Sequence, residues 1–326
     1  MNTMNLPWVE SPFFKDILKE KQLSDEHKRI ATEYNENGFI VLSGIIPQTL
    51  IDDVQKDSEE MGFNQDFPIK THRDANRVQD LWTVSNNSRQ LACFPQVLEI
   101  LEMLYGRETV PFQTLNFKVG TQQKAHSDTI HFSSLPAKYM CGVWVALEDI
   151  TPENGAVYYY PKSQRLPEYD FSSFKDGVND SSYDDYSEYE VFIESLMKQY
   201  DIEKKCFYAK KGDILIWSSN IIHGGSPLLN KDSTRWSQVT HYYFKDCIYY
   251  TPMLSNMVTN ELFLRDKLIN IRTNEPVKQS FNGEDVKFIK MINGKHIINK
   301  RMKEPNVLFK FVGSLIYRHF TNKNSP

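Results

Sequence analysis

The stretch Val110-Pro-Phe-Gln-Thr-Leu-Asn-Phe-Lys-Val119 marks the point where the sequence changes from helical to strand-like patterning. β-Branched and aromatic residues recur in it, as is typical of strands. Runs of the same kind follow, separated by turn residues: Tyr139 to Leu147, Ala156 to Tyr160, Asp213 to Trp217 and Trp236 to Phe244. Short, regularly interrupted runs favour antiparallel sheets, so we predict a β-sandwich or jelly-roll core.

The residues before Gly106 follow a helical pattern instead, with apolar positions three or four apart and recognisable helix ends. The expected elements are a helix from Ser24 to Gly38, a strand from Phe39 to Ile46, and helices from Pro47 to Gly62 and from Ser88 to Tyr105. Helices first and strands afterwards indicate an α+β protein whose sheet core has flanking N-terminal helices.

The composition is that of a globular protein. Of 326 residues, 40% are apolar and 25% charged, and 42 acidic against 38 basic side chains leave a net charge of −4. That balance offers no field for a phosphate backbone and disfavours nucleic-acid binding. The four cysteines are widely spaced, and the sequence shows neither an export signal nor eighteen consecutive apolar residues. We therefore expect a cytoplasmic protein without a membrane span.

Two segments carry opposite charge. Residues 168–194 hold nine carboxylates against one base, and residues 286–326 hold nine bases against one acid. Helical spacing of apolar residues in 305–320 predicts a helix docked on the catalytic domain or on a second subunit, which would make a homo-oligomer. Attachment to an anionic membrane surface is the alternative.

These features divide the chain into parts with different roles. The expected parts are an N-terminal segment of residues 1–23, a catalytic domain of residues 24–250 with an acidic, lid-like insertion at 168–206, and a basic C-terminal extension of residues 251–326.

Two short motifs carry the chemistry. His126-Ser-Asp128 places an imidazole and a carboxylate two positions apart, which on a strand directs both to one face. Asn220-Ile-Ile-His223-Gly-Gly follows a predicted strand and supplies a second imidazole. Two imidazoles and one carboxylate form a facial triad that leaves open positions on a six-coordinate Fe(II). A structural role for the three residues, or a zinc hydrolase with the same ligands, is the alternative.

Arg235 lies twelve residues after His223, at the start of another predicted strand. An inward guanidinium there can bind a carboxylate bidentately, and Ser237 should face the same way and add a hydroxyl donor. An iron site beside an anion clamp implies a small dicarboxylate bound at the metal, although a plain salt bridge of Arg235 is the alternative.

Together, these residues resemble the phytanoyl-CoA dioxygenase family of Fe(II)/2-oxoglutarate oxygenases. The resemblance runs over residues 30–245 and rests on ordered motifs: His126-Ser-Asp128-Thr-Ile-His-Phe, Trp144-Val-Ala-Leu-Glu-Asp149, Asn154-Gly155, His223-Gly-Gly-Ser and Arg235. It implies a double-stranded β-helix core, with O2 and 2-oxoglutarate as co-substrates.

The resemblance also assigns roles to single residues. It implies that His126, Asp128 and His223 bind iron and that Arg235 holds the distal carboxylate of 2-oxoglutarate. Trp144 matches a family tryptophan beside the co-substrate, with ordinary core packing as the alternative. Lys118 resembles a lysine that helps to bind 2-oxoglutarate in related ectoine hydroxylases.

One turn departs from the family. After Asn154-Gly155 the family usually reads Pro-Gly-Ser-His, whereas this chain has Pro161-Lys-Ser-Gln164, which puts any role of that turn in doubt.

The resemblance implies an enzyme that hydroxylates or otherwise oxidises an unactivated C–H bond and releases succinate and CO2. Asp128 favours hydroxylation over chlorination, because related halogenases carry a small residue there. The acidic insertion makes an acyl-CoA unattractive and favours a neutral or amine-bearing small metabolite. A non-catalytic sensor or scaffold that binds 2-oxoglutarate or a metabolite is the alternative.

Several further residues lie near these motifs. We expect His131 and His241 to be hydrogen-bonded pocket or core residues, and Arg77 and Gln79 to be polar surface residues. Aromatic residues of the insertion are expected either to line the substrate or to lie in a solvated loop: Tyr169, Phe171, Tyr183, Tyr186 and Tyr189.

Overall fold

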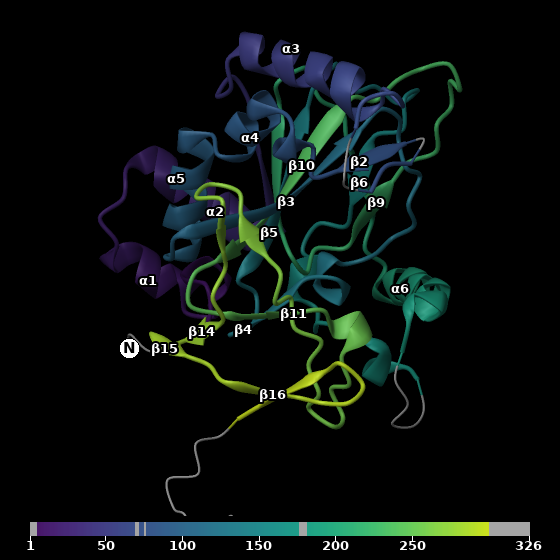
Figure 1. The fold of residues 1–326 in the computed structure, drawn as a ribbon. Coiled ribbons are helices and arrows are strands. Elements are labelled where there is room, and N and C mark those ends of the chain that lie inside the picture. The colour runs from purple at the N-terminus through teal and green to yellow at the C-terminus, as the bar shows by residue number, and fades with distance from the viewer. Residues whose placement is uncertain (1–4, 69–71, 75, 176–180, 300–326) are drawn as a thin grey trace, which may run out of the picture.

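The computed structural model of the chain describes residues 5–68, 72–74, 76–175 and 181–299 (Figure 1). Helices open the chain and antiparallel sheets fill its middle part, which confirms the predicted α+β class. Within the described ranges, no helix is both long and apolar enough to cross a membrane.

The first predicted helix begins and ends where the sequence indicates. Helix α2 covers Asp25–Asn37; the Ser24 hydroxyl accepts a hydrogen bond from the His27 N–H, and Gly38 adopts a φ of +81°. Ser satisfies an N–H that the helix leaves free, and Gly tolerates the left-handed region, so both ends are locally encoded. Strand β1, Phe39–Leu42, follows directly and is shorter than predicted.

The helix predicted over residues 88–105 is in fact two helices. Helix α4 covers Asn86–Ala92 and helix α5 covers Pro95–Tyr105. Pro95 has no N–H to donate to the preceding turn and keeps Phe94 extended, at φ −64° and ψ 122°. The prediction of one helix was therefore wrong, because the apolar spacing continues across a proline that ends the first helix.

A six-stranded antiparallel sheet forms the larger layer, in the order β1-β8-β5-β10-β3-β2. Strand residues alternate between its faces. Val143 and Val145 of β5 belong to the main core, whereas Trp144 and Ala146 face the opposite side. Besides β1, the strands are β2 Arg77–Gln79, β3 Thr109–Phe117, β5 Met140–Ala146, β8 Ile214–Ser218 and β10 Ser237–Phe244.

Helices cover the outer face of this sheet (Figure 1). Besides α2, α4 and α5, they are α1 Phe14–Glu20 and α3 Gln48–Asp57, which continues as a π-helical turn over Ser58–Gly62 and confirms the predicted end at Gly62. Trp8 of the N-terminal segment is buried in the same core.

A three-stranded sheet, β7-β6-β9, lies against the inner face of the larger sheet. Val157 and Phe207 of this sheet belong to one buried cluster with Trp144 and Trp217 of the larger sheet. The two sheets form the double-stranded β-helix core that the family resemblance implies. The strands are β6 Val157–Tyr159, β7 Lys205–Phe207 and β9 His223–Gly225.

The acidic insertion contains an amphipathic helix, α6, over Tyr186–Tyr200. Tyr189, Ile193 and Met197 are buried on one side of α6, in a cluster with Met253 of the C-terminal extension. The described part of the insertion is therefore packed on the protein. Figure 1 shows α6 beside the smaller sheet, away from the N-terminal helices.

The C-terminal extension is built of short antiparallel pairs as far as it is described. Strand β11, Ile248–Tyr250, lies directly before the extension; it pairs with β4, Ser133–Leu135, and so anchors the start of the extension to the core. The following strands are β12 Ile269–Asn270, β13 Glu275–Pro276, β14 Ser280–Phe281, β15 Glu284–Asp285, β16 Phe288–Lys290 and β17 His296–Ile298. The helix predicted over 305–320 lies outside the described residues.

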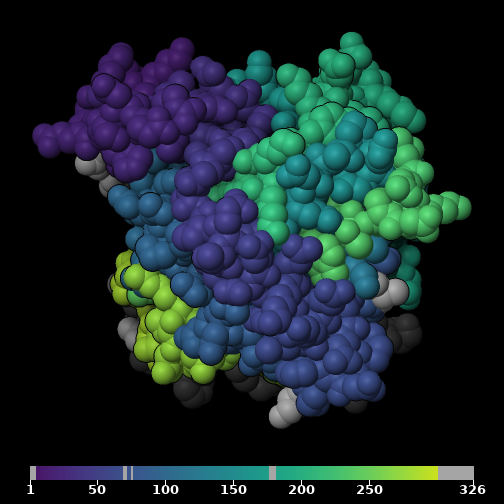
Figure 2. All heavy atoms as spheres, turned by 90° about the horizontal axis from the view of Figure 1, so that it is seen from above, coloured from purple at the N-terminus to yellow at the C-terminus, as the bar shows by residue number. Residues whose placement is uncertain are grey.

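The extension also contacts the helical layer. The Arg89 guanidinium donates to the Ile271 carbonyl (3.0 Å), and Arg272 forms an ion pair with Glu102 (3.4 Å). Figure 2 shows yellow-green residues of the extension beside blue residues of this helical layer. Leu268 is buried in the main core, so this part of the extension is continuous with the catalytic domain.

All four cysteines are free, as their spacing predicts. Cys141 and Cys247 are buried, and Cys93 and Cys206 are half-buried.

Candidate active site

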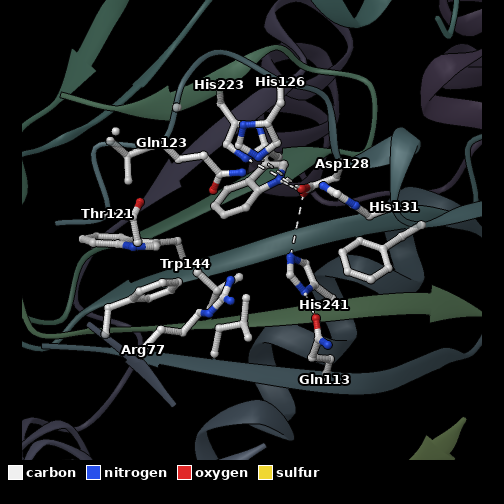
Figure 3. A pocket seen from close by; sticks show the side chains of 18 of the residues that line it. Arg77, Gln113, Thr121, Gln123, His126, Asp128, His131, Trp144, His223 and His241 are labelled. Atoms are coloured by element: carbon white, nitrogen blue, oxygen red, sulfur yellow. Dashed lines mark hydrogen bonds and ion pairs between the residues drawn. The ribbon is translucent and has the colours of Figure 1, made fainter. Parts of the chain in front are cut away.

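A pocket of about 430 Å³ lies between the two sheets (Figure 3). It combines polar and charged side chains from both sheets with aromatic residues. The lining residues are Arg77, Gln79, Gln113, Leu115, Phe117, Thr121, Gln123, His126, Asp128, His131, Phe132, Trp144, Val157, Tyr183, Trp217, His223, Gly224, Gly225, Arg235, Val239, His241 and Arg265.

The backbone brings His126 and His223 together. The two residues exchange both backbone hydrogen bonds, each 2.9 Å long, across an isolated antiparallel bridge. Their ring centroids are 4.5 Å apart. Two motifs almost a hundred positions apart in the sequence are therefore fixed side by side by main-chain atoms alone.

The two glycines after His223 let the neighbouring loop lie against β9. A Cβ atom on Gly225 would lie 2.9 Å from the Gln122 nitrogen, and one on Gly224 would lie 2.7 Å from the Gln123 carbonyl oxygen. Both distances are too short for real side chains, so the His-Gly-Gly sequence has a local packing reason.

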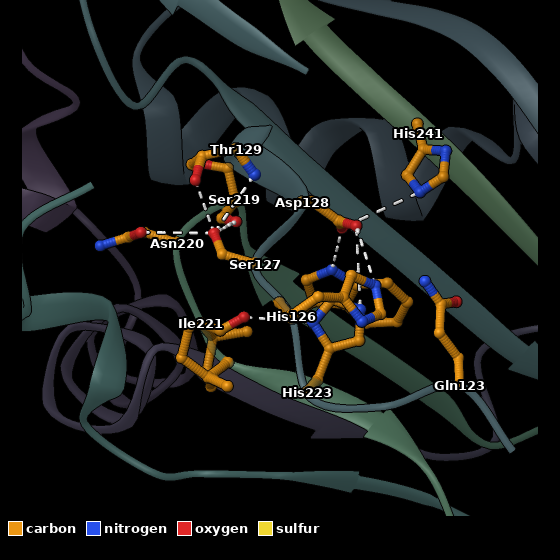
Figure 4. Close-up of polar contacts among 12 residues, drawn as sticks. Gln123, His126, Ser127, Asp128, Thr129, Ser219, Asn220, Ile221, His223 and His241 are labelled. Carbon is orange, nitrogen blue, oxygen red and sulfur yellow. Dashed lines mark hydrogen bonds and ion pairs between the residues drawn. The ribbon is translucent and has the colours of Figure 1, made fainter. Parts of the chain in front are cut away.

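Asp128 reaches the same point from a different backbone conformation than predicted. It begins a 3-10 turn, Asp128–Ile130, and does not lie on a strand with His126. The Ser127 hydroxyl starts this turn by accepting the Thr129 N–H, and it donates to the Ser219 carbonyl (Figure 4). The expectation of a shared strand face was wrong, although the side chains do converge.

The three side chains present a set of atoms that can hold a metal. Asp128 Oδ1 lies 3.9 Å from His126 Nε2 and 3.8 Å from His223 Nε2, and all three atoms fall within 4.8 Å of one another. Each histidine places Nδ1 on a backbone carbonyl, Lys124 for His126 (2.9 Å) and Ile221 for His223 (3.1 Å). A carbonyl only accepts, so Nδ1 carries the proton and each Nε2 offers its lone pair.

Burial keeps these imidazoles neutral. It lowers the pKa of His126 and of His223 to about 4, and His223 adds to the effect on His126. A neutral imidazole is the form that binds a metal. Two imidazoles and one carboxylate with an open side fit non-haem Fe(II).

Trp217 holds the carboxylate from behind. Its indole N–H donates to Asp128 Oδ2 over 2.7 Å, in a buried setting. Gly142, on the neighbouring strand, makes room for the indole, because a Cβ there would overlap the Trp217 ring. The sequence motifs do not indicate this role of Trp217, which they show only as the last residue of a predicted strand.

The turn that departs from the family supports His223 all the same. Ser163 accepts a hydrogen bond from the Ile222 N–H (2.8 Å), and the Tyr160 N–H donates to the Ile222 carbonyl (2.9 Å). Lys162 adopts a φ of +69°, in the region that glycine favours, where the usual family motif has glycine. Pro161 and Ser163 are the residues of that motif which the chain retains.

Arg235 is buried in the pocket without an acidic partner. Its exposed fraction is 3%, its Nε has no hydrogen-bond acceptor, and no carboxylate of the described residues lies within 4.0 Å of its nitrogens. The guanidinium lies 5.6 Å from the Phe117 ring centroid and 5.8 Å from that of Trp144. Burial lowers its pKa to about 10, while Glu148 acts in the opposite direction, so the charge persists at neutral pH.

The other three residues predicted to bind the co-substrate differ in whether they line the pocket. Trp144 lines the pocket, and its indole N–H has no partner there. Ser237 is fully buried, and its hydroxyl donates to the Arg235 carbonyl (3.5 Å). Lys118 is not among the lining residues; its ammonium lies 5.7 Å from the Trp236 ring centroid. Phe117, the last residue of β3, lines the pocket, and Lys118 follows directly after the end of the strand.

His241 and His131 both line the pocket, as expected of pocket residues. His241 Nδ1 contacts Gln113 Oε1 (3.1 Å), and its Nε2 lies 3.9 Å from Asp128 Oδ2. Burial lowers the pKa of His241 to about 4. Figure 3 shows His241 below Asp128, on the side opposite to His126 and His223.

The surface role expected for Arg77 and Gln79 was wrong, because both line the pocket. They belong to β2, the edge strand beside β3, whose alternate residues also face inward. Arg265, from the C-terminal extension, also lines the pocket, and it lies outside all of the sequence motifs.

One aromatic residue of the insertion, Tyr183, reaches the pocket among the described residues. Tyr186 accepts a hydrogen bond from Gln123 and packs against His131. Tyr189 and Phe171 belong to a buried cluster shared with Ile130, Ile222 and Met253, and the Tyr189 hydroxyl accepts a hydrogen bond from the Ser127 N–H (3.3 Å). Tyr169 packs against Phe192.

Comparison with known proteins points the same way. The sequence profile of the phytanoyl-CoA dioxygenase family matches residues 34–236. A human relative, peroxisomal phytanoyl-CoA dioxygenase, is 22% identical over 264 residues, which cover 72% of this chain and 73% of the relative.

Two solved structures are similar in fold. EctD from S. alaskensis, solved with 2-oxoglutarate and 5-hydroxyectoine, has a TM-score of 0.56 and 18% identity, covering 78% of this chain and 86% of that one. The non-heme alpha ketoglutarate dependent carbocyclase SnoK from nogalamycin biosynthesis has a TM-score of 0.54 and 18% identity, covering 70% and 87%. At this identity the likeness shows the fold.

We predict that His223→Ala abolishes Fe(II) binding measured by anaerobic equilibrium dialysis. The affinity should fall by more than about 100-fold, because even the groups behind a ligand are worth 10–100-fold. The control is His72→Ala, an exposed histidine that does not line the pocket. Retention of full Fe(II) affinity in folded His223→Ala protein would contradict the assignment.

We predict that Trp217→Phe weakens Fe(II) binding by roughly 10-fold to 100-fold, because Asp128 loses the donor that orients it. Trp82→Phe is the matched control: it removes an indole N–H from another carboxylate, that of Asp80, which does not line the pocket. Equal effects of the two substitutions would show that the loss is structural.

We predict that the metal-free protein loses stability as the pH falls from about 6.5 towards 4. The pKa values of His126, His223 and His241 lie near 4 in the folded chain, below the usual value of about 6.5. The unfolded chain therefore binds more protons in this window, at a cost of roughly 1–3 kcal/mol per histidine. Urea unfolding across the window measures the slope, and His241→Gln should make it shallower. A flat profile would refute the prediction.

Proposed function

The chain belongs to the phytanoyl-CoA dioxygenase family and is an Fe(II)- and 2-oxoglutarate-dependent oxidoreductase; we propose that it hydroxylates an unactivated C–H bond of a small-molecule metabolite. One observation carries the proposal. A pocket that holds a two-histidine, one-carboxylate set also buries an arginine that has no carboxylate of the described residues within 4.0 Å. A metal site and an anion site in one cavity are what iron and a dicarboxylate co-substrate require.

The residues divide the work by position. His126, Asp128 and His223 would hold iron, and Arg235 would hold the distal carboxylate of 2-oxoglutarate. With iron, 2-oxoglutarate and O2 bound, the site would convert the substrate C–H bond into an alcohol. The other products would be succinate and CO2. Phe117 and Trp144 flank Arg235 and exclude water, which strengthens its attraction for a carboxylate.

A buried guanidinium without a partner is costly to fold, so its presence needs a reason. A structural salt bridge, the alternative for Arg235, would have to involve a carboxylate near it, and the described residues offer none within 4.0 Å. The Glu148 carboxylate is occupied by the Trp236 N–H and the Thr234 hydroxyl. A co-substrate carboxylate is the counter-charge that we propose.

The substrate that we propose is small and is not an acyl-CoA. The pocket volume of about 430 Å³ must hold the co-substrate as well, and it lies near the lower end of the roughly 300–1,000 Å³ common for ligand sites. The acidic insertion beside the pocket would repel the phosphates of coenzyme A. Asp128 occupies the position that a halide would need, which supports hydroxylation over chlorination.

We also propose that residues 24–250 and the described part of the extension act as one unit. The support is that Arg265 lines the pocket and Leu268 is buried in the main core.

The function is tested by adding Fe(II) and 2-oxoglutarate without O2. We expect a weak visible charge-transfer band, and then succinate when O2 is admitted. Arg235→Met should keep Fe(II) binding but weaken 2-oxoglutarate roughly 10-fold to 100-fold, because a charge-assisted bidentate contact is lost.

The same variant separates a binding role from a structural one. Without ligands, Arg235→Met should unfold at the same temperature as the natural chain or higher, because a buried unpaired charge is removed. A large drop in that temperature would favour the salt-bridge alternative. Absence of both the band and succinate in the folded natural chain would favour a non-catalytic protein.

A further inference from the structure

Two more arginines line the pocket besides Arg235. Arg77 lies on β2, opposite Phe117 of β3, and Arg265 follows β11 in the C-terminal extension. In both side chains Nε is buried and has no hydrogen-bond partner. Three guanidiniums therefore face a cavity in which Asp128 is the single carboxylate among the described lining residues.

Arg265 is held by aromatic rings and by one weak polar contact. Its guanidinium lies 4.7 Å from the Phe132 ring centroid and 5.3 Å from that of Phe112. Its side chain contacts the Thr251 hydroxyl at 3.5 Å, the limit for a hydrogen bond. Stacking of this kind orients a guanidinium and leaves its N–H edge free for an anion.

Asp80 is the acid that acts on Arg265 from outside the pocket, and it is already occupied. Burial raises the pKa of Asp80, and hydrogen bonds from Gln79, Thr114 and Trp82 together with the charge of Arg265 oppose this rise. The described residues place no carboxylate within 4.0 Å of the Arg265 nitrogens. Arg265 thus has a distant counter-charge and no ion pair.

Arg77 has an acidic neighbour at a longer distance than a good ion pair. Its Nε lies 3.8 Å from Asp74 Oδ2, and its side chain is 39% exposed. Asp74 also accepts the backbone N–H groups of Asn76 and Arg77 through its other oxygen. The weak contact leaves the Arg77 guanidinium available at the pocket.

Both arginines act on His131, which lies between the iron site and the insertion. Burial is the main reason why the pKa of His131 is lowered to about 3, and the charges of His126, Arg265 and Arg77 add to it. Tyr183 stacks on the same ring. Both guanidiniums line the same pocket as His131 and Tyr183.

The sum of charges in the site with iron and 2-oxoglutarate bound indicates the charge of the substrate. Fe(II) and 2-oxoglutarate carry opposite double charges, and Asp128 offsets Arg235. The charges of Arg77 and Arg265 remain without a partner in the pocket. A neutral or amine-bearing substrate, which the acidic insertion suggests, would leave them unpaired.

We propose that the substrate carries an anionic group, a carboxylate or a phosphate monoester, which Arg265 and Arg77 bind while its C–H bond faces the iron site. This proposal rests on the oxygenase function above and adds a second anion subsite to it. Arg265 lies beyond residue 236, where the family profile ends, so this subsite includes a residue that the matched region lacks. It replaces the expected neutral or amine-bearing substrate.

The test compares four six-carbon probes that differ in the head group: hexanoate, hexyl phosphate, 1-hexanol and hexylamine. Binding is measured on the protein loaded with Fe(II) and saturating 2-oxoglutarate without O2, from the change in the visible band. We expect at least one anion to bind about tenfold more tightly than hexanol, a difference of roughly 1.4 kcal/mol. Preference for hexanoate or for hexyl phosphate distinguishes a carboxylate from a phosphate.

Matched variants locate the effect. Arg265→Gln should remove the anion preference, Arg265→Lys should retain part of it, and Arg77→Gln should weaken it. Arg272→Gln is the control, because Arg272 belongs to the same extension, pairs with Glu102 and does not line the pocket. The unfolding temperature of each variant shows whether it is folded.

Two results would overturn the proposal: hexanol or hexylamine binding as tightly as both anions, or an anion preference that survives Arg265→Gln. Failure of both anions to bind would also overturn the proposal. The unfolding temperature of the metal-free protein with each probe gives a second readout that needs no iron. A missing visible band therefore counts against the oxygenase function alone, and a missing anion preference counts against the subsite alone.

Discussion

The paired backbone hydrogen bonds between His126 and His223 are the interaction on which the site depends. They join a loop that follows β3 to β9 in the smaller sheet, so the two imidazoles are positioned by main-chain geometry and not by flexible side chains. Each ring is then turned by a carbonyl of its own chain segment, two residues upstream. These bonds do not orient the Asp128 carboxylate. Trp217, in the larger sheet, orients it by donating a hydrogen bond. A metal set built this way is arranged before any ion binds, which lowers the cost of binding.

Charge burial is the second constraint, and it works against folding. Among the described residues, Arg235 is enclosed with no ion pair, and Arg77 and Arg265 line the same cavity with weak or distant acidic neighbours. Aromatic rings, not carboxylates, hold Arg235 and Arg265 in position. Burial of Arg235 sacrifices stability at the site, because its charge loses solvent without a full replacement. Function is the reason that such strain persists in natural proteins, and ligands with matching charge relieve it.

The sequence alone predicts the iron triad, Arg235 and the order of helices and strands, because these lie in short motifs or regular patterns. Local signals also place the ends of α2 correctly. Prediction fails where the deciding contact is remote. Trp217 matters through Asp128, 89 positions away, and Arg77 and Gln79 matter because a three-residue edge strand pairs with β3. Lys118 shows the opposite error: it lies close to the motif in sequence, but its ammonium lies near the Trp236 ring and does not line the pocket.

The segments outside the regular core decide what the pocket can accept. The region that matches the family supplies the candidate triad and Arg235, for which we propose roles common to many substrates. Arg265 comes from the extension after that region, and Tyr183 comes from the acidic insertion within it. Both segments are tied to each other through Met253, which packs with α6, so the pocket wall is shared between them. The acidic insertion lies near the surface, whereas Arg235 and Arg265 line the pocket. A substrate with an anionic group would pass the acidic insertion and then be bound by the pocket arginines. Because the insertion repels negative charge, this arrangement favours small anions over a bulky polyphosphate.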